Sequence, residues 1–410
     1  MAGLTWENLY AERIGGKGYG KSNEIYKFEK IKRAKRAALA DFPERSLLDF
    51  GIGENDEMAP EAVRAAMKRE VDNPENRGYA DNGIQLYKDR AAEFMAREFG
   101  VSLNPVTEVN HCIGSKPALG MLPAAFINPG DITIMTVPGY PVAGTYTKYY
   151  GGEVYNLPLT KERNFLPDLE NIPDAVADRA KLLVVNYPNS PTGALAPTSF
   201  FEKVIRFASD HQLVVVNDAA HMMLTYGRKP LSFLQIDGAK EVGVEVHSMS
   251  KGFNMIGWRL GFVCGNENVV RAFADVKDNS DSGQFIAIQK AASEALADPS
   301  IPAAIRTKYE RRLKKLVQTL QKLGFQAEMP GGTYFLYVPA PKGVENGPQF
   351  QNAEDCSQFL IRERSVCTVP WDNAGAFLRF SVTYQAPTEA DEDALMKSLL
   401  ERLGSDRFRW

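Results

Sequence analysis

The amino-acid sequence predicts an α/β protein with a large domain, built on a mostly parallel and doubly wound mixed sheet, and a smaller α+β domain. Two observations support this fold class. Short apolar runs alternate with helical patterns over residues 46–295, and beyond residue 300 a long polar helix precedes two strand candidates and a terminal helix. The 410 residues, at roughly 150 residues per domain, are enough for two or three domains.

Eight apolar runs, each bounded by Gly, Pro, Asn or Asp, are predicted as strands. Several are apolar on both faces, as strands covered by helices on each side must be. Three stretches between them, 116–127, 141–150 and 198–210, have the helical spacing of such covering helices. The eight runs are residues 46–53, 108–114, 131–137, 153–159, 181–188, 212–218, 244–250 and 260–265.

The two chain ends differ from this middle region. KFEKIKRAKRAALADFPERS is predicted as a basic amphipathic helix that ends before Pro43, and AAIRTKYERRLKKLVQTLQKLG as a long helix closed by Gly324. The strand candidates TYFLYVP and AFLRFSV and the helix EADEDALMKSLLERLG follow. The long helix is expected to present a solvated basic face, made of Arg311, Arg312, Lys314 and Lys315.

Charge and composition exclude several classes of partner. The chain has 48 Lys and Arg against 51 Asp and Glu, a net charge of −3, which argues against nucleic acid and acidic membrane surfaces. No run of 18 apolar residues predicts a membrane span, and the N-terminus has no apolar signal region. The four cysteines show no C-x-x-C spacing, so we expect reduced thiols, no structural zinc and a cytoplasmic location.

Two other motifs are weaker. Gly15 to Ser22 fits the P-loop pattern, with Asp218 as a Walker B candidate, but the preceding WENLYAERI is polar and helical where a buried strand is required. A nucleotide triphosphatase is therefore disfavoured, and a flexible loop is expected there. The four histidines show no metal-ligand spacing, and no G-x-S-x-G elbow occurs, so neither a metal site nor a serine hydrolase is predicted.

A stronger constellation centres on Lys251. Lys251 follows Ser248 and Ser250 directly after an apolar strand, and Arg259 comes eight residues later. An amine between hydroxyls and a guanidinium suits a nucleophile beside a phosphate or oxyanion. Asp218 ends another apolar strand, at the sheet edge where open α/β sheets bind ligands, and a carboxylate there needs a cationic partner.

Three further segments complete a pattern. Ser115 and Lys116 open a helix directly after a strand, where helix N–H groups suit a phosphate. Tyr140 is a flat aromatic at another strand end, and YPNSPTG, residues 187–193, is a loop in the same register. Together these residues indicate a planar, phosphorylated aldehyde cofactor, pyridoxal phosphate.

These motifs resemble the class I/II aminotransferases of fold type I over essentially the whole chain. The resemblance rests on P-N-S-P-T-G, on N-D-A-A and on S-x-S-K with its arginine, in this order along the chain. EIYKFEKI, FGIGE, NRGYADNG, IGSKPAL, VPGYPV and FNMIGWRLGF are similar to the LL-diaminopimelate aminotransferase group. This implies a reversible amino transfer between LL-2,6-diaminopimelate and 2-oxoglutarate, in lysine biosynthesis, with tetrahydrodipicolinate and glutamate as the biosynthetic substrates.

The resemblance also implies roles for single residues. Lys251 would bond the cofactor and, once freed by substrate, move a proton, while Asp218 would pair with the ring nitrogen. Tyr140 would stack on the ring, and Arg379 would bind the substrate α-carboxylate. The residues implied to hold the phosphate are Ser115, Lys116, Ser248, Ser250 and Arg259.

Further implied positions concern the pocket and the partner subunit. Tyr26 and Gly53 match positions that line the substrate pocket, and Tyr79 would reach the cofactor of the neighbouring subunit, which requires a homodimer. Structural alternatives stay open: Tyr79 and Tyr140 as core or interface aromatics, Arg379 as a surface ion pair, Tyr26 in packing and Gly53 in a turn.

Two residues depart from the family pattern. Ser190 stands where an asparagine is usual before P-T-G, and His221 where a tyrosine follows D-A-A. Both positions are implied to hydrogen-bond the 3′ oxygen of the cofactor. Serine is shorter and would need water or help from Asn189, whereas a neutral imidazole still donates or else His221 merely fills space. The loop from Tyr79 to Gly83 is also one residue shorter than usual.

The resemblance implies two domains, a large one over 46–295 that binds the cofactor and a small one formed by 1–45 and 296–410. Two alternatives remain open at this point. The first is another class I/II aminotransferase, acting on alanine, aspartate or an aromatic amino acid, and the second is a pyridoxal-phosphate-dependent lyase. A regulator without catalysis would need a DNA-binding module, for which we find no spare segment. Arg379 and the N-terminal motifs favour transfer over elimination.

Overall fold

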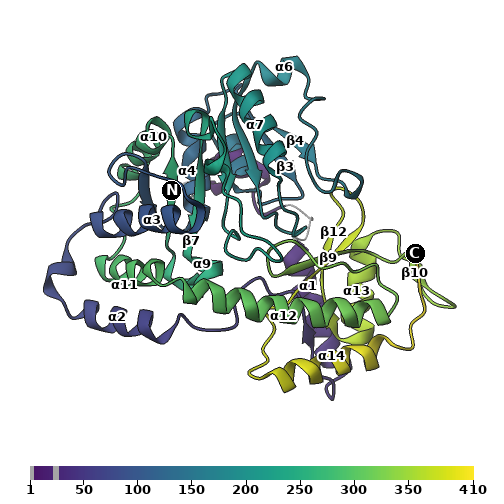
Figure 1. The fold of residues 1–410 in the computed structure, drawn as a ribbon. Coiled ribbons are helices and arrows are strands. Elements are labelled where there is room, and N and C mark those ends of the chain that lie inside the picture. Colours follow the sequence, from purple (N-terminus) through teal and green to yellow (C-terminus); the bar gives the residue numbers. More distant parts are fainter. Residues whose placement is uncertain (1–3, 22–26) are drawn as a thin grey trace.

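The computed structural model describes residues 4–21 and 27–410 and centres on a seven-stranded sheet (Figure 1). The strand order is β2-β8-β7-β6-β5-β3-β4, in which β8 runs antiparallel to both neighbours and the other pairs are parallel. The strands are β2 Val109–Cys112, β3 Ile132–Val137, β4 Glu153–Pro158, β5 Ala180–Asn186, β6 Val214–Asp218, β7 Gly243–Ser248 and β8 Gly261–Gly265.

Helices cover both faces of this sheet, because its central strands are apolar on both sides. Leu182 and Val184 of β5 pack with α4 Ser115–Phe126, α5 Val142–Tyr149 and α10 Glu267–Asp278. The intervening Leu183 and Val185 belong to the opposite layer, with α3 Gln85–Phe99 and α7 Thr198–His211. The predicted doubly wound, mostly parallel sheet is therefore confirmed.

Residues 46–53 are predicted as a strand of the large sheet, and this assignment to the large sheet is wrong. This run forms only the short strand β1 Leu48–Asp49, which pairs with β11 Val366–Cys367 outside the large sheet. Phe50 then packs edge-on against Phe380 and Tyr384. An apolar run requires burial, but it does not specify which of two cores supplies it.

The predicted strand 244–250 is also shorter than expected. β7 ends at Ser248, and the short helix α9 Met249–Gly252 begins there. The Ser248 hydroxyl accepts a hydrogen bond from the Ser250 amide at 3.1 Å, which caps this helix. Lys251 therefore lies in this short helix and not in strand β7.

The smaller part of the molecule contains the antiparallel sheet β12-β13-β9 and the pair β10-β14. α1 packs on α13 through Ile31, Ala34 and Ala38, which lie against Ile361 and Val369. α12 spans both halves of the molecule in Figure 1. These elements are α1 Lys27–Asp41, α12 Ser300–Lys322, α13 Ala353–Arg364, α14 Glu389–Leu403, β9 Phe335–Pro339, β10 Gly343–Val344, β12 Val369–Trp371, β13 Phe377–Ser381 and β14 Phe408–Arg409.

The predicted solvated face of α12 is wrong for Arg312. Its side chain has no exposed surface, whereas Lys314 is 59% exposed and pairs with Glu310. Arg312 contacts Asp56 and Glu392, both of them buried. A buried guanidinium needs such partners, and its carboxylates come from segments about 80 and 250 residues away in sequence, which helical spacing does not reveal.

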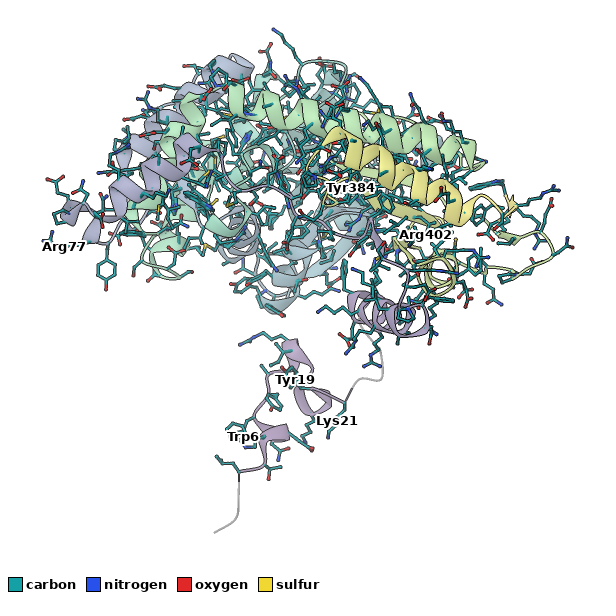
Figure 2. The ribbon with its side chains drawn as sticks, turned by 90° about the horizontal axis from the view of Figure 1, so that it is seen from below. Trp6, Tyr19, Lys21, Arg77, Tyr384 and Arg402 are labelled. Atoms are coloured by element: carbon teal, nitrogen blue, oxygen red, sulfur yellow. The ribbon has the colours of Figure 1, made fainter. Side chains whose placement is uncertain are left out.

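The N-terminal residues form three 3-10 helices on a segment that projects from the main body, where Figure 2 labels Trp6, Tyr19 and Lys21. Gly15 to Lys21 lie in these turns, and no strand precedes them among residues 4–21; Ser22 lies outside the described residues. The remaining helices are η1 Trp6–Asn8, η2 Glu12–Ile14, η3 Gly16–Gly18, η4 Pro74–Arg77, η5 Lys161–Arg163, η6 Phe233–Gln235, η7 Ile256–Trp258, α2 Glu61–Val71, α6 Asp174–Ala177, α8 Ala239–Val242 and α11 Ile286–Ala297.

All four cysteines are buried as free thiols. Within the described ranges, no helix is long and apolar enough to cross a membrane. The same residues contain no cluster of three or more His, Cys, Asp or Glu side chains suited to a metal ion.

Thr388 caps α14 and offers a test of local stability. Its hydroxyl accepts from the Asp391 amide at 3.2 Å, and its own amide donates to the Asp391 carboxylate at 3.0 Å. We expect Thr388→Ala to lower the free energy of unfolding by about 1 kcal/mol, measured by urea denaturation. Thr307→Ala, at an exposed position inside α12, is the control and should change it by less than about 0.5 kcal/mol. Equal effects would contradict the capping assignment.

Candidate functional site

The predicted residues gather at the carboxyl ends of the parallel strands. Gly114 follows β2, Asn189 follows β5, Asp218 ends β6, and Lys251 follows β7. Because these strands run in the same direction, their carboxyl ends share one edge of the sheet, where open α/β sheets bind ligands. The loop after β1 approaches the same edge from the smaller part of the molecule, since Gly53 contacts Lys251.

Asp218 is a carboxyl group that burial disfavours in its charged form. Its side chain is 5% exposed, and its Oδ1 accepts a hydrogen bond from the Ala220 amide at 3.2 Å. Burial raises the pKa of Asp218 to about 6, against the opposing effects of that amide, His247 and Lys251. The carboxylate would therefore gain from a cationic ligand group.

Lys251 joins the sheet to the loop after β1. Its Nζ donates to the Gly53 carbonyl at 3.0 Å, and its own carbonyl accepts from Asn55 Nδ2 at 2.8 Å. The Tyr334 hydroxyl also donates to the Gly53 carbonyl, at 2.7 Å. A Cβ on Gly53 would meet Phe335 only at 3.7 Å, an ordinary contact, so this glycine acts here through its carbonyl.

A cradle for an anion forms where β2 ends and α4 begins. Gly114 has a φ of +80° just before Ser115, and a Cβ on it would overlap the Arg259 guanidinium. Arg259 Nη1 donates to the Ser250 hydroxyl at 3.4 Å, and Ser250 is bonded through its amide to Ser248. A guanidinium beside hydroxyls and the first N–H groups of a helix favours a phosphate.

Arg379 enters the site from β13. Its side chain is 7% exposed, its Nη2 donates to the Gly51 carbonyl at 3.1 Å, and its guanidinium lies 4.2 Å from the Phe335 ring centroid. Burial lowers the pKa of Arg379 to about 10. Its buried Nε has no partner within the described residues. A guanidinium with an unmet donor in an apolar setting favours a carboxylate ligand.

Ser190 and His221, the two departures from the family pattern, lie where further buried polar atoms have no hydrogen-bond partner in the described chain. Asn189 is fully buried and its Oδ1 accepts from the Thr192 hydroxyl at 2.7 Å, but its Nδ2 has no partner in the described chain. His221 Nδ1 is likewise buried without one. Burial, together with Lys251, lowers the pKa of His221 well below its ordinary value, so the ring is neutral. Ser190 is half-buried, with its amide bonded to Asn186.

Three predicted residues have exposed side chains, and a fourth is not described. Lys116, in the first turn of α4, is exposed, and Tyr140, after β3, is 41% exposed. Tyr79 is 85% exposed, so it is a surface residue of the single chain. Tyr26 lies outside the described residues.

Sequence reasoning missed several residues that shape this site. Tyr334 and Phe335 belonged to a predicted apolar strand, yet they contact Gly53, and both rings pack against His221. Asn55 carries no motif of its own. An apolar or loop pattern gives no signal for such roles, because they arise from segments about 200 to 280 residues apart.

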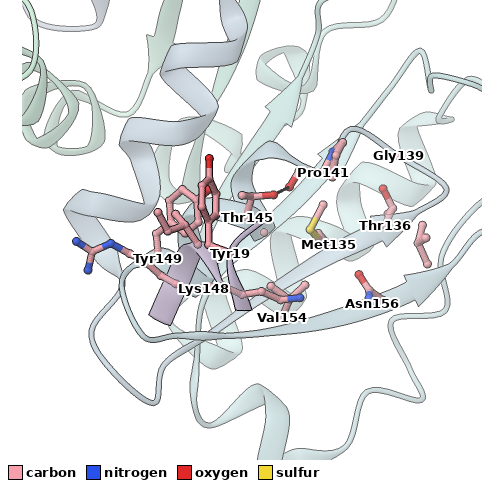
Figure 3. Close-up of a pocket in the computed structure, with 14 residues that line it drawn as sticks. Tyr19, Met135, Thr136, Gly139, Pro141, Thr145, Lys148, Tyr149, Val154 and Asn156 are labelled. Atoms are coloured by element: carbon pink, nitrogen blue, oxygen red, sulfur yellow. Dashed lines mark hydrogen bonds between the residues drawn. The ribbon is translucent and has the colours of Figure 1, made fainter. Parts of the chain in front are cut away.

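A separate pocket of about 740 Å³ lies between α5 and the N-terminal segment (Figure 3). Its lining includes Gly139 and Pro141, which flank Tyr140, together with Tyr19 and Lys148. The buried charged residues described above do not line it, so it is not the same site.

Comparisons with known proteins agree with this arrangement. The family model "Aminotransferase class I and II" matches residues 45–399. The LL-diaminopimelate aminotransferase of Methanocaldococcus jannaschii is 55% identical over 97% of both chains, and that of Methanococcus maripaludis is 53% identical over 98% of both. These relatives bear the name of the group that the N-terminal motifs resemble.

Solved structures give the same family. A substrate-bound BacF structure from Bacillus subtilis has a TM-score of 0.84 at 30% identity and covers 98% of both chains. An aspartate aminotransferase double mutant of Thermus thermophilus has a TM-score of 0.83 at 27% identity over 98% of this chain and 100% of that one. The expected fold is thus confirmed, and the chain belongs to the class I and II aminotransferase family.

Proposed function

We propose that this aminotransferase moves an amino group between LL-2,6-diaminopimelate and 2-oxoglutarate, in lysine biosynthesis. The observation that carries the proposal is the full-length identity of 53–55% to two LL-diaminopimelate aminotransferases. The site supports the general reaction, since a half-buried lysine amine, a buried carboxyl group and a buried guanidinium converge in it. In the biosynthetic direction the acceptor is tetrahydrodipicolinate and the donor is glutamate.

We propose pyridoxal phosphate as the cofactor, because the unmet groups of the site fit it. The cradle of Ser115, Ser250 and Arg259 suits its phosphate. Asp218, with its raised pKa, suits a protonated ring nitrogen. The buried Asn189 Nδ2, and His221 Nδ1 in the tautomer that carries its proton there, suit its ring oxygen. Ser248 supports the cradle, while Tyr140, Lys116 and Ser190 are proposed as further cofactor contacts.

When bound, pyridoxal phosphate supplies an aldehyde that carries the amino group and a ring that delocalises the electron pair left at the substrate Cα. Lys251 is proposed as the general base and acid that removes and returns the Cα proton. Its hydrogen bond to the Gly53 carbonyl holds the free amine at the site. The Asp218 carboxylate would stabilise the positive charge of the protonated ring nitrogen. Arg379 would bind the substrate α-carboxylate through its Nη groups and through its Nε, which has no partner in the described chain.

We propose a homodimer in which Tyr79 contacts the cofactor of the partner subunit. The exposure of Tyr79 supports this, because an aromatic side chain that is 85% exposed is unusual on a monomer surface. Hydrogen bonds anchor the loop that follows Tyr79. The Asp81 carbonyl accepts from buried Lys277 at 2.5 Å, and the Ile84 amide donates to Gln289 at 2.8 Å. A fixed loop with an exposed aromatic tip suits an interface.

We also propose the expected division into a large domain of about 46–295 and a small one from 1–45 and 296–410, with one change: the boundary moves past Asp49, because β1 pairs with β11. The packing of α1 on α13 supports assigning the N-terminal end to the small domain, and the pairing of β1 with β11 supports including Leu48 and Asp49 in it. Four buried free thiols support a reducing, cytoplasmic location.

A substrate panel tests the proposed reaction. We expect kcat/KM for LL-diaminopimelate with 2-oxoglutarate to exceed that for alanine, aspartate or tyrosine by at least about 100-fold, measured by glutamate formation. Lys251→Ala, as the control, should abolish both the activity and the visible absorption band of the bound cofactor. Glutamate formed only from the other amino acids would refute the substrate, and pyruvate released from cysteine without 2-oxoglutarate would indicate a lyase.

Asp218 gives a test that depends on pH. Its folded-state pKa of about 6 lies above the ordinary value, so the ionised carboxylate destabilises the cofactor-free chain above pH 6. We expect Asp218→Asn to raise the free energy of unfolding of the cofactor-free chain by about 2–3 kcal/mol at pH 7.5. The gain should vanish towards pH 4, where the native carboxyl is protonated, and cofactor affinity should fall. A gain that persists at pH 4 would contradict the assignment.

Mixing inactive subunits tests the shared site. Lys251→Ala and Tyr79→Ala should each be nearly inactive alone. When co-refolded, random pairing should restore about one quarter of wild-type activity, because half the dimers carry one intact site. A mixture that stays as inactive as the separate variants would argue against the partner role of Tyr79.

A further inference from the structure

The loop after β1 carries backbone carbonyls to both halves of the site. The Gly51 carbonyl accepts from Arg379 at 3.1 Å, and the Gly53 carbonyl accepts from Lys251 at 3.0 Å. Between them, the Ile52 carbonyl accepts from the Thr383 hydroxyl at 3.0 Å. The segment Gly51–Asp56, here called the strap, therefore contacts the two side chains that the proposed reaction uses for proton transfer and carboxylate binding.

The strap ends at a buried charge. The Asp56 side chain is 4% exposed and accepts from Lys308 Nζ at 2.7 Å and from the Tyr309 hydroxyl at 3.1 Å. Arg312 Nη1 lies 3.1 Å from Asp56 Oδ2, the oxygen that also accepts from Lys308. All three partners lie on α12, which spans both halves of the molecule in Figure 1. A buried carboxylate with three donors resists displacement, because moving it would leave buried charges unpaired.

The middle of the strap is linked to the same helix through Tyr334. Tyr334, whose hydroxyl donates to the Gly53 carbonyl, packs edge-on against Tyr309, with ring centroids 5.4 Å apart. Adjacent rings thus hold two points of the strap, Gly53 through Tyr334 and Asp56 through Tyr309.

Arg312 also fixes the chain that leaves β13. It donates to the carbonyls of Val382 and Tyr384 at 3.0 Å and of Ala386 at 2.9 Å, and to the Glu392 carboxylate at 2.8 Å. Val382 lies three residues after Arg379. One fully buried guanidinium therefore holds both the strap and the segment that carries the guanidinium of the site.

We propose that Asp56 and Arg312 are positioning residues that hold the strap in place. The strap in turn sets the distance between the Lys251 amine and the Arg379 guanidinium, and this distance determines how well amino-acid and oxo-acid substrates bind. This inference rests on the proposed function. Neither residue touches the reacting atoms. Both substrates of an aminotransferase use the same α-carboxylate position, so a loosened strap weakens the binding of both.

Asp56→Asn in the holoenzyme tests the proposal. We expect KM for the amino donor and for the oxo acid to rise together by about 10-fold or more, while the visible cofactor band and cofactor affinity change less than about 2-fold. Amide hydrogen exchange over residues 48–60 should become at least about 10-fold faster. Asp56→Glu keeps the charge and should recover part of the wild-type KM. Lys314→Gln, on the exposed side of α12, is the matched control and should change neither KM nor exchange.

Tyr309→Phe keeps the test decisive if Asp56→Asn does not fold. It removes only the hydroxyl that donates to Asp56, and we expect the same changes at about 3-fold. A lower melting temperature with wild-type KM for both substrates, or unchanged exchange over the strap, would overturn the proposal. Loss of the cofactor band in step with activity would do the same. If the substrate panel identifies another amino acid as the donor, KM of the variants and of the wild type is measured with that amino acid. Failure of the proposed reaction is then detected with the wild-type chain alone, and failure of the strap proposal is detected with the variants.

Discussion

The hydrogen bond between the Lys251 amine and the Gly53 carbonyl joins the two halves of the molecule at the proposed active site. Lys251 leaves the central sheet through the turn capped by Ser248, and Gly53 arrives on the loop that follows β1. Neither half contains a complete site. The placement of α12, α14 and β13 matters for function because these elements determine where the loop after β1 lies against the sheet.

The site retains polar groups that folding by itself would not favour. Burial shifts the pKa of Asp218 upwards and the pKa of Arg379 and His221 downwards, in each case towards the neutral form. The buried atoms Asn189 Nδ2, His221 Nδ1 and Arg379 Nε have no partner among the described residues. Such groups cost stability in the chain alone and become favourable when a charged, planar ligand meets them. The buried groups without partners therefore indicate which charges and hydrogen-bonding atoms the ligand must carry.

The departures from the family pattern fall within this set. Ser190 is too short to replace an asparagine, and the neighbouring Asn189 presents a buried, unmet amide. His221 is neutral and packs edge-on against Tyr334, which also bonds the Gly53 carbonyl. His221 thus contacts Tyr334, which shares the Gly53 carbonyl with Lys251, so the substitution at this position is physically connected to the strap.

Local patterns in the sequence were sufficient for the sheet and for the residues at its carboxyl edge. Apolar strands that end in Asp218 or lead into Lys251 must share that edge, because parallel strands run in one direction. Sequence patterns could not reveal the partner of β1, the burial of Arg312 or the roles of Asp56 and Tyr334. A basic helix face and an apolar run look the same whether they meet solvent or another segment. Those contacts join residues about 80 to 320 positions apart, and only the packing of the two halves against each other decides them.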